Sequence, residues 1–230
     1  MYDHLLFDAD GTLLDFVSAQ RWALRQVFVS LDLLPTEDNL NIYSQINNEI
    51  WLEYEQGLIT MEALKTERFK RFYAKFNLTG DYEATSKLYA KTLSQSYHLY
   101  DDALPTLQRL KENNIEMSMI TNGISFIQKG RLKAAAIENY FKVIVISEEI
   151  GLQKPDPLYF EKTLDLIKER GINVNKALVI GDSLTSDIAG AVNAKLDSVW
   201  INRYHMERYI DVKPNYEITK LEQLFNVLNL

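Results

Sequence analysis

The fold class is decided by residues 4–13, which read HLLFDADGTL. The first half is a short apolar run that stops at Asp8, which is typical of a buried strand that ends in a loop. Asp8 and Asp10 lie two residues apart, so on extended backbone their carboxylates point the same way. Gly11 lets the chain turn sharply after them. A capped turn or a calcium loop also begins this way, but Leu13-Leu14 follows here instead of the further acids that a calcium loop needs.

Four later segments repeat the pattern of a short apolar run that stops at polar residues: 116–120, 142–146, 177–180 and 198–201. Stretches with apolar residues at helical spacing separate these segments. Strands that alternate with helices predict right-handed βαβ units, and therefore an α/β protein with a Rossmann-like parallel sheet. Ligands bind such sheets at the carboxyl ends of the strands, which is where the polar residues lie.

Residues 16–97 have a different character. They are rich in Leu, Tyr, Trp, Glu and Lys, their apolar residues recur at roughly helical spacing, and no part of the segment has a strand pattern. Gly57 and Gly80 are typical of helix ends. We therefore predict a catalytic core formed by residues 1–15 and 98–230, with an all-helical domain inserted as residues 16–97.

Two carboxylates also follow the apolar run 177–180. Asp182 comes two residues after the run, and Asp187 comes five residues later. Taken alone, Asp187 is explained as an acid in the first turn of a helix. That explanation does not account for two strands that both end in acids. Carboxylates crowded at one sheet edge repel one another unless a cation neutralises them, and a hard cation with oxygen ligands, Mg²⁺, meets this need.

Two further polar segments lie between these acidic motifs. Thr121-Asn122 follows the second predicted strand, where a hydroxyl and backbone N–H groups can hold phosphate oxygens at a helix N-terminus. Such residues are also ordinary helix caps. Lys154 stands in a loop whose backbone is restricted by Pro155 and Pro157, so we expect its side chain to have a fixed direction. The alternative is that Lys154, like most loop lysines, is a solvated surface charge.

The four motifs, in this order, resemble those of the haloacid dehalogenase superfamily, and the helical insertion resembles its type 1 cap. The resemblance implies a phosphatase in which Asp8 is the nucleophile and forms an aspartyl-phosphate. Asp10 would protonate the leaving oxygen and later accept a proton from water. Mg²⁺ would be held by the Asp8 carboxylate, the Asp10 backbone carbonyl and Asp182.

The same resemblance implies that Lys154, Thr121 and the N–H of Asn122 balance the charge of the phosphoryl group, and that Asp187 supports the metal site or orients Lys154. Two related activities remain alternatives. A dehalogenase would use Asp8 on carbon without a metal, but Asp10 argues against it. A phosphomutase would return the phosphoryl group to a sugar. A binding protein on an inactive fold is disfavoured because Asp8, Asp10, Lys154 and Asp182 are all present.

Segments 50–60, 146–151 and 200–202 resemble the branch of the superfamily that contains pyrimidine 5′-nucleotidases. We therefore expect a nucleoside 5′-monophosphate as substrate, with pyrimidine deoxynucleotides favoured. Trp22, Tyr43, Trp51 and Tyr54 in the insertion could stack on a base, although such residues usually pack a helical core. The alternative is a small ester such as phosphoglycolate or a sugar phosphate, for which Arg21 and Arg25 are the basic candidates.

Composition excludes several other classes of function. A formal charge of −7 with scattered Lys and Arg offers no footprint for a nucleic-acid polymer. The absence of cysteine excludes disulfides and thiolate catalysis and fits a reducing compartment. No run approaches the ~18 apolar residues of a membrane span, and the first residues lack a signal-peptide pattern. We expect a cytoplasmic enzyme without membrane partners.

Overall fold

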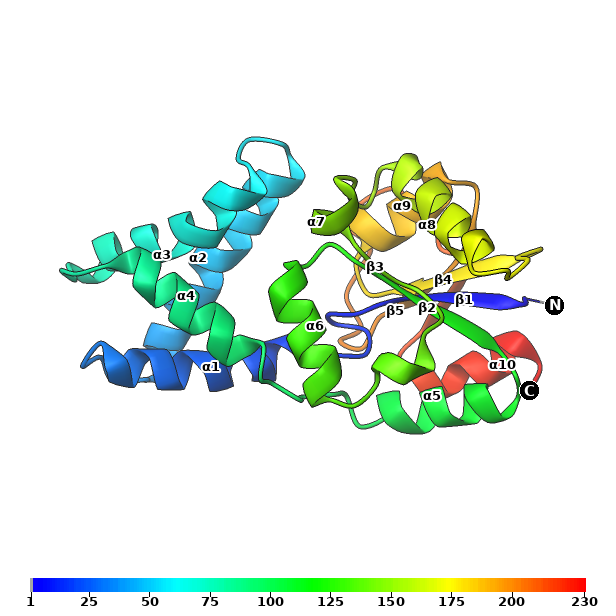
Figure 1. Cartoon of the computed structure of the whole chain (residues 1–230), viewed down its shortest axis with the longest axis horizontal. Helices are drawn as coiled ribbons and strands as arrows, with labels where there is room; N and C mark the ends of the chain where they lie inside the picture. The colour runs from blue at the N-terminus through cyan, green and yellow to red at the C-terminus, as the bar shows by residue number, and fades with distance from the viewer. Residues whose placement is uncertain (1) are drawn as a thin grey trace. The chain divides into compact units, whose positions relative to one another are not determined.

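The computed structural model describes residues 2–230, and the chain divides into two compact units (Figure 1). The core unit comprises Met1–Phe16 with Tyr97–Leu230, and the helical unit comprises Val17–Ser96. No helix within residues 2–230 combines the length and the apolar character that crossing a bilayer requires.

The core unit is built on a parallel sheet of six strands in the order β3-β2-β1-β4-β5-β6, which confirms the predicted Rossmann-like α/β fold. The strands are β1 (His4–Asp8), β2 (Glu116–Thr121), β3 (Ile144–Ile146), β4 (Ala177–Gly181), β5 (Asp197–Ile201) and β6 (Tyr216–Ile218). The last strand was not expected from the sequence. β1 lies at the centre, between β2 and β4, and is buried along its whole length.

Helices cover both faces of this sheet (Figure 1). One apolar layer joins Leu5 and Phe7 of β1 to the helices α5 (Ala103–Glu112) and α10 (Leu224–Leu228). The other joins Leu6 to α8 (Pro157–Glu169) and α9 (Ala189–Asn193). The helical segments of the core unit are α5 (Ala103–Glu112), α6 (Ser125–Ala134), η1 (Glu138–Tyr140), α7 (Ser147–Ile150), α8 (Pro157–Glu169), the π-helical turn η2 (Leu184–Ile188), α9 (Ala189–Asn193), η3 (Leu221–Gln223) and α10 (Leu224–Leu228).

The strand order has a direct consequence for the site. Along the chain the sheet grows from β1 toward β2 and β3 on one side, and then toward β4, β5 and β6 on the other. The order therefore reverses between β1 and β4. Connections leave such a switch point in opposite directions and open a crevice at the carboxyl ends of the two strands. Asp8 ends β1 and Asp182 directly follows β4, so both acids lie at this crevice.

The helical unit has its own core of aromatic rings. Its helices are α1 (Phe16–Ser30), α2 (Glu37–Glu55), α3 (Met61–Phe76) and α4 (Tyr82–Leu93). The side chains of Thr36, Thr60 and Asp81 accept hydrogen bonds from backbone N–H groups in the first turns of α2, α3 and α4. These N-caps satisfy donors that have no partner within the helix. Tyr43 packs against Phe69, whose ring centroid lies 5.0 Å away, and both are fully buried.

The two chain segments that connect the units run side by side. Leu14 and Leu99 form an antiparallel bridge. The Asp15 N–H donates to the His98 carbonyl at 3.1 Å, and the Tyr100 N–H donates to the Leu13 carbonyl at 3.0 Å. The chain therefore leaves and re-enters the core unit through two adjacent, hydrogen-bonded strands of backbone.

Candidate active site

Three carboxylates meet at the carboxyl ends of β1 and β4. One oxygen from each of Asp8, Asp182 and Asp187 lies within 4.8 Å of the others. Asp8 and Asp187 are buried, whereas Asp182 is exposed. Asp187 comes from η2, in which the Ser183 side chain accepts the Ser186 N–H at 3.1 Å. Three acids this close require positive charge, which is the requirement that the sequence indicated.

Two glycines allow this close approach. Gly11 has φ +83°, and a Cβ at this position would lie 2.1 Å from an Asp182 carboxylate oxygen. A side chain there would therefore collide with Asp182 and would also be strained by the left-handed backbone. A Cβ on Gly181 would lie 2.3 Å from Asp187. The glycine of each acidic motif thus makes room for a carboxylate of the group.

Lys154 supplies positive charge from within the protein. Its Nζ donates to Asp8 Oδ1 at 2.7 Å, to Asp187 Oδ1 at 2.6 Å and to the Ile120 carbonyl at 3.2 Å. The residue is 1% exposed. Burial lowers the pKa of Lys154, but Asp187 and Asp8 more than offset that effect and raise it above its ordinary value. Lys154 is therefore a permanently charged, fixed ammonium between two acids.

One oxygen of Asp8 remains without a partner. Asp8 Oδ2 is buried and accepts no hydrogen bond from any residue in the described chain. Burial raises the pKa of Asp8 to about 7, against the opposing attraction of Lys154. A buried carboxylate oxygen without a donor is costly. Its position in a group of three acids fits a bound cation, and the all-oxygen donor set is the kind that Mg²⁺ prefers.

Asn122 fixes the loop that carries Lys154. Its Nδ2 donates to the Lys154 carbonyl at 2.8 Å, and its Oδ1 accepts the Lys154 N–H at 2.9 Å. Both contacts are to backbone, so the amide holds the loop without restricting the ammonium group. The side chain of Asn122 is thus occupied by the loop, a contact that the sequence did not indicate.

Thr121 ends β2 beside this loop. Its N–H donates to the Tyr159 hydroxyl at 2.9 Å, which itself donates to the Val145 carbonyl at 2.8 Å. The Thr121 Oγ1 accepts the Gly123 N–H at 3.1 Å and a Gln128 N–H at 2.9 Å. A hydroxyl that accepts two hydrogen bonds has its own proton left to donate.

Asp10 lies apart from the group of three acids. Its side chain is turned toward α6, where Arg131 Nη1 donates to Oδ1 and Gln128 Nε2 donates to Oδ2, the latter at 2.7 Å. Its carboxylate is one-third exposed. The structure therefore brings Asp8, Asp182 and Asp187 close together, with Lys154 bound to Asp8 and Asp187, and places Asp10 next to them on separate partners.

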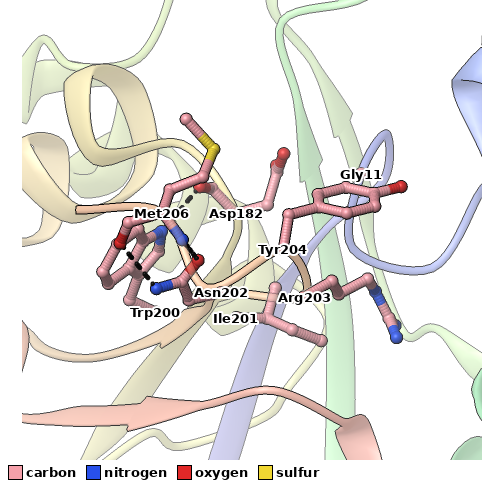
Figure 2. Close-up of a pocket in the computed structure, with 8 residues that line it drawn as sticks. All are labelled: Gly11, Asp182, Trp200, Ile201, Asn202, Arg203, Tyr204 and Met206. Carbon is pink, nitrogen blue, oxygen red and sulfur yellow. Dashed lines mark hydrogen bonds between the residues drawn. The ribbon is translucent and has the colours of Figure 1, made fainter. Parts of the chain in front are cut away.

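A small cavity of about 40 Å³ lies beside Asp182 (Figure 2). Its volume suffices for two or three water molecules. Trp200 on β5 forms part of its wall and donates Nε1–H to the Asp182 carbonyl at 2.8 Å, which fixes the backbone at the exposed acid. Arg203 donates to the Thr12 carbonyl at 2.8 Å and forms a two-point ion pair with Asp102.

Sequence reasoning did not find Trp200, Arg203, Gln128 or Arg131. Gln128 and Arg131 were findable in principle, because they are polar residues at i and i+3 on the helix that follows Thr121-Asn122. The spacing does not reveal that both are buried. Trp200 belongs to the segment 200–202 that resembles the nucleotidase branch, but that resemblance does not indicate its contact with Asp182, and Arg203 follows no pattern beyond its place after β5.

Comparisons with known proteins agree with this geometry. Residues 5–201 match the family described as haloacid dehalogenase-like hydrolase. The pyrimidine 5′-nucleotidase PynA of Streptococcus pneumoniae is 35% identical over 228 residues, which cover 99% of this chain and 95% of that protein. The pyrimidine 5′-nucleotidase YjjG of Escherichia coli is 28% identical over 227 residues, covering 99% and 98%. A crystal structure of the HAD-hydrolase YfnB from Bacillus subtilis, bound to magnesium, has a TM-score of 0.91 and 34% identity, covering 100% and 99%.

Proposed function

Because this chain belongs to the haloacid dehalogenase-like hydrolases, we propose that it is a Mg²⁺-dependent phosphomonoester hydrolase that acts on nucleoside 5′-monophosphates, pyrimidine deoxynucleotides above all. The observation that carries the proposal is the buried Asp8, which has one oxygen on Lys154 and the other without a partner, within a group of three acids. A candidate nucleophile, a fixed positive charge and a candidate cation site therefore lie together at one edge of the sheet.

In the first step, an Asp8 carboxylate oxygen attacks phosphorus as the bond to the leaving oxygen breaks, which produces an aspartyl-phosphate. Asp10 gives a proton to the leaving oxygen. In the second step, water attacks the same phosphorus, its proton goes to Asp10, and the bond to Asp8 breaks. Free phosphate leaves and both carboxyl groups return to their starting states.

The remaining residues stabilise the transferred phosphoryl group. Lys154 offers a fixed positive charge, and Thr121 offers a hydroxyl proton that no described residue accepts. Asn122 keeps the Lys154 loop in place. Phosphoryl transfer depends chiefly on positioning and on stabilising charge, and these side chains provide both. Asp187 orients Lys154 through the bond at 2.6 Å.

The acids fit Mg²⁺. Asp8, through its unpartnered oxygen, and the exposed Asp182 would hold it, together with the Asp10 backbone carbonyl. When bound, Mg²⁺ supplies positive charge for the phosphoryl oxygens. We expect that EDTA removes activity, that Mg²⁺ restores it, and that Ca²⁺ binds but inhibits because its larger, looser coordination shell misplaces Asp8. Phosphate release in metal-buffered solutions measures all three effects.

A readout independent of activity accompanies this test. Mg²⁺ that binds only the native state stabilises it by about 2.7 kcal/mol at a concentration 100-fold above Kd, which a thermal unfolding experiment detects. Asp182→Asn is expected to lose this stabilisation, while Asp165→Asn, at an exposed position on α8, retains it. Full phosphate release after exhaustive chelation would contradict the proposed dependence on Mg²⁺.

The substrate preference follows from relatives and from the helical unit, which we propose to be a cap that reads the leaving group. The relatives PynA and YjjG are named pyrimidine 5′-nucleotidases. Tyr43 packs within the aromatic core of the unit, so it is unavailable to a base. Trp51 and Tyr54 remain half-buried, with ring centroids 5.8 Å apart. Stacking on such a ring contributes about 1–3 kcal/mol per base.

The basic candidates for a small-ester site are already paired. Arg21 and Arg25 both form ion pairs with Glu37, and Arg21 also donates to Asn41 at 2.7 Å. Glu37 offsets one of the two positive charges, so the two arginines attract a small anionic substrate less strongly than unpaired ones would. This pairing favours the nucleotide over phosphoglycolate or a sugar phosphate.

We expect kcat/KM for dUMP and dTMP to exceed that for phosphoglycolate and glucose 6-phosphate by tenfold or more, because a base adds stacking energy that the small esters lack. Trp51→Ala is expected to reduce kcat/KM for dUMP and to leave p-nitrophenyl phosphate unaffected. A tenfold preference for the small esters would refute the nucleotidase proposal and leave only a general phosphatase.

A further inference from the structure

Two side chains of α6 hold both oxygens of Asp10. Gln128 and Arg131 lie one helical turn apart and are 1% and 0% exposed. Arg131 Nη1 donates to Asp10 Oδ1, and Gln128 Nε2 donates to Asp10 Oδ2 at 2.7 Å. Arg131 Nη1 also donates to Gln128 Oε1 at 3.3 Å. The Asp10 carboxylate is therefore fixed in direction by one helix, α6. Without these contacts, the Asp10 side chain could rotate, because it stands in a loop.

The burial of Arg131 requires explanation. Its Nε and Nη2 are buried without an acceptor in residues 2–230, and Asp10 is the acid with which it forms an ion pair. The ring of Phe16 lies 5.7 Å from its guanidinium carbon. A buried charge costs several kcal/mol unless it is well paired, so a merely structural position would be better served by an apolar side chain. Arg131 is thus placed for Asp10, at a cost to stability.

Gln128 connects Asp10 with the proposed phosphate site. The same Nε2 that contacts Asp10 donates to Thr121 Oγ1 at 2.9 Å. Gly123 makes this reach possible, because a Cβ there would come within 2.6 Å of the Gln128 side chain. One amide therefore sets the position of Asp10 relative to the hydroxyl that faces the phosphoryl group.

We propose that Arg131 and Gln128 are positioning residues that hold Asp10 for hydrolysis of the phosphorylated enzyme. The inference rests on the proposed function and identifies residues that serve its second step. In that step the water oxygen bonds to phosphorus, the phosphorus bond to the Asp8 oxygen breaks, and the water proton passes to Asp10. Each oxygen of a carboxylate has two lone pairs, so Asp10 can accept this proton while α6 still holds it.

The test separates the two steps with p-nitrophenyl phosphate, whose leaving group departs without a proton donor. Arg131→Met is expected to lower kcat at least tenfold, because water activation is slowed, and to change kcat/KM less than twofold, because that ratio reports formation of the phosphoenzyme. KM should fall in parallel with kcat. A pre-steady-state burst of p-nitrophenolate should approach one equivalent per active site.

Matched variants distinguish positioning from folding. Lys133→Met, at an exposed position of the same helix, is expected to behave as the wild type. Gln128→Met should likewise lower kcat while leaving kcat/KM nearly unchanged, with a smaller effect on kcat. If Arg131→Met does not fold, Gln128→Met is the deciding variant. Arg131→Lys should recover part of kcat because it retains a charged donor.

Two results would overturn the inference. An equal loss in kcat and kcat/KM without a burst, in the folded variants, would show a general structural effect. Values within twofold of the wild type would show that Asp10 needs no help from α6. If the wild type releases no phosphate with Mg²⁺ from any ester, the proposed function fails, and this inference fails with it. If the wild type is active and the variants are unaffected, the inference about α6 is refuted while the proposed function stands.

Discussion

Asp8→Asn is expected to lower phosphate release below detection while the protein remains folded. Asparagine has nearly the same shape, and its oxygen can still accept the hydrogen bond that Lys154 Nζ makes to Asp8 Oδ1 at 2.7 Å. An amide oxygen is, however, too weak a nucleophile to form a phosphoenzyme. Burial raises the pKa of Asp8 to about 7, so the charged carboxylate is disfavoured in the folded state. Removal of that charge should leave the unfolding temperature unchanged or raise it.

The measurement is kcat with dUMP and p-nitrophenyl phosphate, accompanied by thermal unfolding without metal. Asp165→Asn, which replaces an exposed acid on α8, serves as the matched control and should retain full activity. Substantial turnover by Asp8→Asn, with contamination by host phosphatases excluded, is incompatible with an aspartyl-phosphate on this residue.

Lys154→Met is expected to reduce kcat by ~10² or more, since a charge fixed beside the reacting group contributes on this scale. The ammonium bridges Asp8 and Asp187, and the two hydrogen bonds of Asn122 to the Lys154 backbone hold the loop that carries it. Breaking a buried ion pair typically costs about 3–5 kcal/mol. Turnover is therefore compared at a temperature at which both the variant and the wild type are folded.

Lys162→Met, at an exposed position on α8, is the control for loss of a lysine charge. A second variant, Asp187→Asn, tests whether orientation matters, because it leaves the ammonium but weakens its bond at 2.6 Å. We expect it to fall between the wild type and Lys154→Met. If Lys154→Met loses no more activity than Lys162→Met, Lys154 has no part in the reaction.

The sheet was predictable because its central strands are continuous apolar runs that end at polar residues. β1 and β4 are buried at every residue, and each was recognised within a residue of its observed bounds. β6 was missed because only Ile218 of its three residues is buried, so no apolar run marks it. β3 was expected at 142–146 but spans Ile144–Ile146, at the edge of the sheet, where one neighbouring strand defines it.

The proximity of the acids at the candidate site was predictable for a related reason. They follow strands directly, and the carboxyl ends of parallel strands share one edge, so position in the sequence implies proximity in space. The resemblance to the haloacid dehalogenase superfamily, which rested on these residues, is confirmed. The contacts of Arg131 and Trp200 were not predictable, because they depend on which face of a helix or strand a long side chain occupies and on the direction that it takes.

The junction between the two units bears on how such an enzyme acquires new substrates. Asp15 and His98 lie beside each other, joined by backbone hydrogen bonding, and some eighty residues of chain separate them. The insertion thus resembles a long hairpin loop whose two ends are fixed by the core. Lengthening, trimming or exchanging that loop leaves the register of β1 against β2 and β4 untouched. If the helical unit reads the leaving group, as proposed, recognition and chemistry can diverge independently, and grafting of this unit at residues 15 and 98 is expected to alter specificity.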